Sequence, residues 1–178
     1  MKCVFTQGAI LLLLLALAGC ASSGAIRQAT PITTGVRVSV DFALIQTSTA
    51  LAGLETETNL LNDLVISGLR GSGVFGDVDG DPAAAGSSGG VKVAIKILEV
   101  KTITHDERSW AGAMAGRARI LVQATVTDLS SGKPVETFES EGLSSGGSNL
   151  AGITDEAVQR AAEQVVAEVI RISRLTGP

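Results

Sequence analysis

Aromatic residues, histidine and cysteine are scarce in this 178-residue sequence, and tyrosine is absent. Only 3% of the residues are aromatic, so few side chains could stack on sugars or bases. The sequence also has no basic run, and its net charge of −4 argues against nucleic-acid binding. The single histidine, His105, has no cysteine close by and cannot complete a zinc shell. We therefore expect no metal and no cofactor.

Two short motifs suggest chemistry, and each lacks the residues that this chemistry needs. Residues 142–146 match the nucleophile motif Gly-x-Ser-x-Gly, but His105 precedes them, whereas a catalytic base would follow. Residues 77–81 resemble the start of a calcium loop, yet Pro82 and Ser88 stand where it requires glycine and glutamate. We expect a protein that is not an enzyme. Weak calcium binding by the three aspartates of residues 77–81 remains an alternative.

The N-terminus has the pattern of a secretion signal. Residues 9–18 are an unbroken apolar run, too short for a membrane span of about 20 residues and typical of a signal peptide. Residues 17–20, Leu-Ala-Gly-Cys, resemble a bacterial lipobox. That resemblance implies cleavage between Gly19 and Cys20 and a lipid on Cys20, which would anchor the protein in a membrane. The alternatives are a secreted protein cut nearby and an uncleaved membrane anchor.

The residues after the expected anchor predict a location and a tether. In lipoprotein families an aspartate after the lipidated cysteine commonly marks inner-membrane retention, and here Ala21 follows Cys20. The resemblance therefore implies an outer-membrane protein facing the periplasm. Residues 20–34 are small, polar and proline-containing, so we expect a flexible tether that could extend about 45 Å. A packed, irregular N-terminal segment is the alternative.

The hydrophobic pattern of residues 35–178 predicts a single α/β (α+β) domain. Two amphipathic helices and about four strands would form a mixed or antiparallel sheet, in the order β-α-β-β-β-α, with both helices on one face. We expect Thr47–Thr49 and Thr154 to cap the helices, a bulge near Glu99, and a Gly132 turn before a strand that lies nearer an edge. The expected strands cover residues 36–44, 91–104, 117–128 and 135–141, residues 74–78 form a brief strand or a turn, and the expected helices cover residues 52–70 and 155–174.

Residues 110–116 are an uncharged segment of mostly small residues between two expected strands. Polar turn residues are usual at such a position. One interpretation is a contact surface for a partner protein, formed by Trp110, Gly112, Met114 and Gly116, with Trp110 as its anchor. The alternative is a connection folded over the core, with Trp110 buried.

Several segments together resemble the bacterial lipoproteins grouped as domain of unknown function 4410. They are the lipobox, the end of the first helix (residues 69–78), the small-residue stretch 112–116, the hairpin 128–135 and the glycine pair before the last helix. The resemblance implies a compact envelope lipoprotein and no known activity. More distantly, the layout is similar to periplasmic domains of curli-secretion lipoproteins and of penicillin-binding-protein activator lipoproteins.

These features predict a lipid-anchored, non-enzymatic protein of the cell envelope. We expect it to act as an adaptor or assembly factor that binds another envelope protein, because the chain combines an anchor with a small domain lacking a catalytic set. The alternative is a periplasmic protein that binds a small molecule or a metal through residues 77–90 and 142–152.

Overall fold

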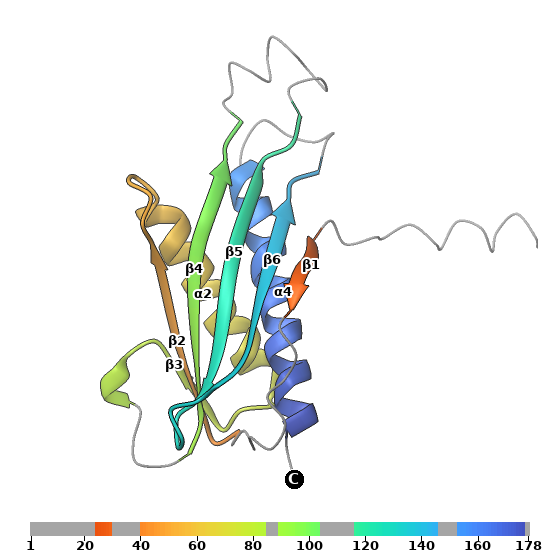
Figure 1. The fold of residues 1–178 in the computed structure, drawn as a ribbon. Helices are drawn as coiled ribbons and strands as arrows, with labels where there is room; N and C mark the ends of the chain where they lie inside the picture. The colour runs from red at the N-terminus through yellow and green to blue at the C-terminus, as the bar shows by residue number, and fades with distance from the viewer. Residues whose placement is uncertain (1–23, 30–39, 85–88, 104–115, 146–152, 177–178) are drawn as a thin grey trace, which may run out of the picture.

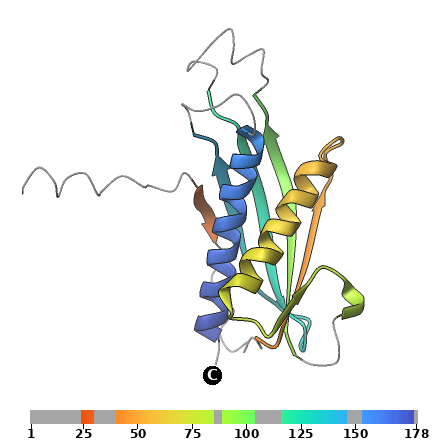
Figure 2. The same cartoon turned by 180° about the vertical axis from the view of Figure 1, so that it is seen from behind.

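The computed structural model describes residues 24–29, 40–84, 89–103, 116–145 and 153–176. In these ranges six strands form one mixed sheet, and two long helices pack on one of its faces (Figures 1 and 2). This confirms the α+β class and the side on which both helices lie. The elements are β1 (Gly24–Ala29), β2 (Phe42–Thr49), α2 (Glu55–Ser72), β3 (Asp77–Asp79), the 3-10 turn η2 (Pro82–Ala84), β4 (Val91–Lys101), β5 (Arg119–Asp128), β6 (Pro134–Leu143) and α4 (Ile153–Thr176).

The sheet has the strand order β1-β6-β5-β4-β2-β3. Its β4, β5, β6 and β1 strands pair antiparallel, whereas β2 runs parallel to both β4 and β3. A parallel pair needs a crossover, and α2 forms part of the connection from β2 to β4. Residues 135–141 were expected nearer an edge, and β6 is the second strand from one border, with β1 paired to its outer side.

The expected tether contains the strand β1. Gly24 to Ala29 pair with residues 142 to 138 of β6, and Ile26 packs against the hydrophobic core. Backbone pairing does not depend on apolar side chains, so a small and polar composition did not prevent this segment from joining the sheet. The flexible-tether prediction is therefore wrong for residues 24–29, and the folded unit begins before residue 35.

The expected helix caps are also corrected. Thr47–Thr49 belong to β2, whose pairing with β4 extends to the last register pair, Thr49 with Ile97. Helix α2 instead follows Leu54, which makes no side-chain cap, and Thr154 lies inside α4. Pairing with β4 continues through residues 47–49 and keeps them in the strand, so no helix starts there. Residues 36–39 of the expected first strand lie outside the described residues.

The core lies between the sheet and the helices. Alternate residues of the central strands face α2 and α4, and the apolar stripes of both helices cover them. Among the described helices, none is both long enough and apolar enough to cross a membrane. The buried core residues include Ile45, Val91, Val93, Ile95, Ile97, Ile120, Val122, Ala124, Val126 and Phe138 of the sheet, Leu61, Val65 and Leu69 of α2, and Val158, Val165, Val169 and Ile172 of α4.

Helix α4 is held against β6 by a close contact and by an ion pair. Gly142 lies so close to the helix that a Cβ built on it would stand 2.7 Å from Ala161 N and would overlap Ala157 O. Farther along the helix, Arg171 Nη2 donates to both carboxylate oxygens of Glu136, at 2.8 and 2.9 Å. The Glu136 side chain is 2% exposed, so this pair neutralises a buried charge.

The β4 bulge and the β5–β6 turn agree with the sequence. The β4–β5 register shifts between Ile97 and Glu99, and Gly132 adopts the left-handed backbone with φ 67°. The Asp128 carboxylate accepts hydrogen bonds from the backbone N–H and hydroxyl groups of Ser130 and Ser131. Burial raises the pKa of Asp128, but the hydrogen bonds from Ser131 and Ser130 outweigh it and hold that pKa below the ordinary 3.8.

Replacing Asp128 with asparagine is expected to lower stability at pH 7 by about 1–2 kcal/mol, because the amide cannot accept all four hydrogen bonds. The lowered pKa means that the ionised carboxylate stabilises the fold above pH 3.8. This stabilisation is lost as the pH falls through the pKa of the folded state. Urea unfolding at pH 7 and pH 3 should show the difference between wild type and variant shrinking in acid. An unchanged difference would contradict this role.

Candidate functional site

Most of the site residues expected from the sequence lie outside the described residues. These are Gly19 and Cys20 of the lipobox and Trp110, Gly112 and Met114 of the segment before β5. Gly116 is described: it has φ 87° and lies at van der Waals distance from Ile103, 4.0 Å from its Cδ1 to a Cβ built on the glycine. The lipid anchor and the Trp110 contact surface therefore remain predictions.

Ser144, the central residue of the Gly-x-Ser-x-Gly motif, has a structural role. Its Oγ accepts the Ala118 N–H at 2.9 Å, and its own N–H donates to Ala118 O at 3.0 Å. The residue is fully buried, so its hydroxyl is not presented to solvent as a nucleophile. The next residue, Ser145, donates its N–H and its hydroxyl to Glu156 of α4. The motif thus connects the end of β6 to the start of β5 and to α4.

The Asp77, Asp79 and Asp81 carboxylates are each bound to nearby backbone groups. Asp77 accepts the Val78 N–H, Asp79 accepts those of Gly80 and Asp81, and Asp81 accepts that of Ala83. The backbone N–H groups of Asp81 and Gly80 lower the pKa of Asp79. The described residues contain no group of three His, Cys, Asp or Glu side chains arranged to hold a metal ion.

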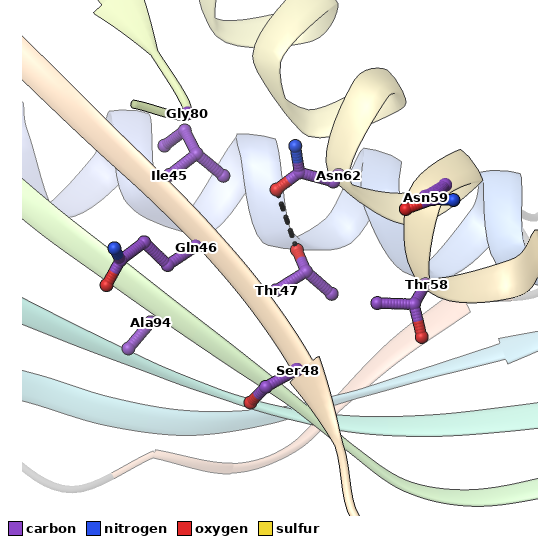
Figure 3. Close-up of a pocket in the computed structure, with 9 residues that line it drawn as sticks. All are labelled: Ile45, Gln46, Thr47, Ser48, Thr58, Asn59, Asn62, Gly80 and Ala94. Atoms are coloured by element: carbon purple, nitrogen blue, oxygen red, sulfur yellow. Dashed lines mark hydrogen bonds between the residues drawn. The ribbon is translucent and has the colours of Figure 1, made fainter. Parts of the chain in front are cut away.

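A polar pocket of about 500 Å³ lies between the outer border of β2 and the first turns of α2 (Figure 3). Thr47 Oγ1 donates to Asn62 Oδ1 at 3.1 Å and joins the two elements across the pocket. All of the lining side chains are uncharged, and most are hydroxyls or amides. The lining residues are Ile45, Gln46, Thr47, Ser48, Thr58, Asn59, Asn62, Gly80 and Ala94.

The backbone of β2 borders this pocket as an incompletely paired strand. On its inner side β2 pairs with β4 from Ala43 to Thr49, whereas β3 pairs with its outer side only from Phe42 to Leu44. No strand of the described chain pairs with the outer side of residues 45–49. In Figure 1, β2 accordingly forms the left border of the sheet. A row of backbone donors and acceptors on such an edge can bind an extended peptide.

Sequence reasoning missed this pocket. It interpreted Thr47–Thr49 as helix caps, although residues 45–49 contain no charge, proline or glycine and carry three β-branched side chains. That composition favours a strand. A polar strand without charges indicates an exposed sheet edge that lacks the residues that usually prevent pairing with another chain.

A second hollow, of about 530 Å³ and mainly apolar, lies on the outer surface between α2 and α4. Leu64, Val166 and Ile170 are among its lining residues. The helices approach each other closely at Gly68, where a built Cβ would stand 2.8 Å from a Val166 methyl group. Small residues such as Gly68 and Ala162 thus line the bottom of the hollow, where the two helices are close together.

Comparisons with known proteins support the fold. No family model and no curated protein matches the chain. A PelC dodecamer from Paraburkholderia phytofirmans is 14% identical, covering 80% of this chain and 95% of the other, with a TM-score of 0.56. A second PelC dodecamer from this organism is 17% identical over 87% and 99% of the two chains (TM-score 0.52). A Xanthomonas campestris protein of the domain-of-unknown-function 330 family is 16% identical over 83% and 94% (TM-score 0.54). At these identities, the likeness shows a shared fold.

Proposed function

We propose that this protein is a lipid-anchored, non-enzymatic protein of the cell envelope that acts as an adaptor or assembly factor by binding protein chains. The observation that carries the proposal is the half-paired β2 strand beside an uncharged polar pocket. Hydroxyls, amides and free backbone groups recognise an extended peptide by hydrogen bonds, whereas no described lining residue is an acid, a base or a thiolate.

Two further observations support this function. The lipobox resemblance places the anchor at Cys20, with the domain on the periplasmic side of an outer membrane. PelC, which shares the fold, is a dodecamer, so this architecture is compatible with assembly. Membership of the domain-of-unknown-function 4410 lipoproteins belongs to the same proposal. A lipid anchor would raise the local concentration of the domain near other envelope proteins and so favour weak contacts.

A small-molecule-binding protein is the second candidate, favoured by the volume of the pocket. Its lining fits a small, uncharged polar ligand such as a sugar, and the local bonds of Asp77, Asp79 and Asp81 make a metal less suitable. Calorimetry with neutral sugars on wild type and on Asn62→Ala separates the two functions. Heat of binding that disappears in the variant would favour the small-molecule function.

Replacing Cys20 with alanine is expected to abolish incorporation of labelled palmitate and to move the protein from the membrane fraction to the soluble periplasmic fraction. Three acyl chains make dissociation from a bilayer negligible, whereas the bare chain has no such anchor. Cys3→Ala is the matched control and should keep both the label and the membrane location, because Cys3 lies before the cleavage site. Equal labelling of wild type and Cys20→Ala would remove the anchor from the proposal.

A further inference from the structure

The sheet ends in β1 and in the short strand β3, and part of the outer side of β2 extends beyond β3 without a partner strand among the described residues. At one border, β1 pairs with β6 on its inner side only. At the other border, β3 covers only the first three residues of β2, and residues 45–49 stay open. Figure 1 shows β1 and β2 on opposite sides of the sheet. Among the described residues, six at one border and five at the other therefore lack a neighbouring strand.

The open backbone groups of β2 can be assigned. Asp77 N–H donates to Asp41 O, and Ile45 O faces Gly80, so the odd-numbered residues direct their carbonyls outward. Consecutive residues of a strand point their backbone groups to opposite sides, and Thr47 and Thr49 therefore also direct N–H and C=O outward. Their even-numbered neighbours face β4. Two residues thus present an alternating row of donors and acceptors next to the polar pocket.

Neither border carries a proline, a lysine or an unpaired charge of the kind that commonly prevents edge pairing, and β1 has a bulge between Ile26 and Gln28. Natural edges are protected by proline, lysine or inward-pointing charges, and residues 45–49 have none of these. In β1 the one charged residue is Arg27, whose Nε lies 3.5 Å from Glu141 Oε2 of the neighbouring β6 strand. That ion pair directs the Arg27 charge toward its own sheet. Neither border therefore repels an incoming strand.

We propose that β1 of a second copy of this chain pairs with the outer side of β2, so that the sheet continues from one copy to the next. This inference rests on the proposed function and identifies its partner. The occupant is a second copy because one chain carries both borders. The two unpaired stretches have similar lengths, and neither carries a charge that would repel the other. Strand directions alternate from β1 through β6 and β5 to β4, and β2 is parallel to β4, so β1 runs opposite to β2 within one copy. If neighbouring copies have the same orientation, β1 of one copy and β2 of the next therefore pair antiparallel.

Such a contact joins two different surfaces, β1 on one copy and β2 on its neighbour. Contacts of this head-to-tail type close into a ring when the rotation per copy allows it, and otherwise they propagate as a filament. PelC, which shares this fold, is a dodecamer. The twist of the sheet supplies a rotation from copy to copy.

The first test removes one backbone donor from the β2 border. Thr47→Pro loses the outward N–H, keeps the bonds of residues 46 and 48 to β4, and should weaken self-association at least about tenfold. Thr47→Val, which retains the N–H and loses only the hydroxyl, is the matched control and should assemble like wild type. The measurement is light scattering of the purified lipidated protein in detergent, with circular dichroism to confirm folding. Equal assembly of wild type and folded Thr47→Pro would overturn the inference.

The second test does not depend on proline being tolerated. Gln28 lies opposite Glu139 on the face of the sheet without helices. The Thr47 side chain points toward α2, so its neighbour Ser48 points to the same helix-free face as Gln28. Mixing Gln28→Cys protein with Ser48→Cys protein and a copper-phenanthroline oxidant should give a heterodimer disulfide. Glu163→Cys on the outer side of α4 is the control partner and should give none. No Gln28–Ser48 disulfide would overturn the inference.

These results also separate the inference from the function on which it rests. A monomeric wild type that crosslinks in the envelope to a different protein through β2 would overturn the second-copy inference and leave the adaptor function standing. A wild type that neither self-associates nor crosslinks to any protein would overturn both.

Discussion

Replacing Gly142 with alanine is expected to cost at least about 3 kcal/mol of unfolding free energy, and to leave little folded protein. The added Cβ would overlap Ala157 O and approach Ala161 N to 2.7 Å. Both atoms belong to the backbone of α4, so no side-chain rotation can relieve the contact. The helix would have to move away from β6 and give up part of the core, including Val158 and Val165. Chemical denaturation followed by circular dichroism measures the loss.

The matched control is Gly71→Ala in α2. A Cβ at Gly71 meets nothing within 4 Å, and the residue is helical, so alanine should stabilise the protein by about 0.5–1 kcal/mol. The same substitution is thus expected to have opposite signs at the two glycines. A Gly142→Ala variant as stable as wild type would mean that α4 does not approach β6 as closely as described.

Replacing Arg171 with alanine is expected to lower stability by about 3 kcal/mol, because the Glu136 carboxylate would be left buried without its partner. Arg171 also binds Glu168 at 2.7 Å. The hydrogen bond that Arg171 donates to Glu168 raises the pKa of Arg171; burial opposes this shift, and the charge of Glu136 assists it. The guanidinium is therefore charged at every accessible pH, and its removal leaves two acidic groups near each other. Urea unfolding at neutral pH measures the effect.

Two further variants test this explanation. Arg160→Ala removes an i,i+4 ion pair with Glu156 on the same helix, where both side chains are about 30% exposed, and should cost less than about 1 kcal/mol. The double variant Glu136→Met, Arg171→Met removes both charges and should recover most of the loss, because Glu136, the more deeply buried of the two carboxylates, is no longer present, and Glu168 keeps contact with solvent. Failure of the double variant to recover would show that the packing of the arginine stem, and not its charge, stabilises α4.

Strand and helix periodicity predicted the central part of this fold well. The alternation in β4 and β5 and the apolar stripes of α2 and α4 placed the core correctly, because burial of these residues is decided by local pattern. The slip at Glu99 was also predicted, because the apolar alternation breaks there, and so was the turn at Gly132, because glycine readily adopts a left-handed backbone. The strands β1 and Ile45–Thr49 were not predicted, because pairing with a distant strand holds them in place.

The candidate site was harder to predict for the same reason. The pocket combines residues of β2 with Thr58 and Asn62 of α2 and with Gly80, and no spacing in the sequence links these positions. Ser144 shows why a motif alone is insufficient: Gly-x-Ser-x-Gly suggests a nucleophile, the position of His105 argued against one, and the fold uses the hydroxyl as a buried acceptor for the Ala118 N–H. Uncharged polar residues indicate a binding site only when the fold gathers them at one place, as it does here beside the β2 border of the sheet.

If Cys20 carries the proposed lipid, the position of β1 in the sheet determines how the domain is oriented relative to the membrane. Only residues 21–23 separate Cys20 from Gly24, a reach of about 14 Å at full extension instead of the 45 Å expected for a long tether. Gly24 lies opposite Gly142, at the end of the sheet where β5 begins and β6 finishes. A lipidated Cys20 would therefore hold that end of the molecule against the headgroups, with the Asp128–Lys133 hairpin pointing away into the aqueous compartment.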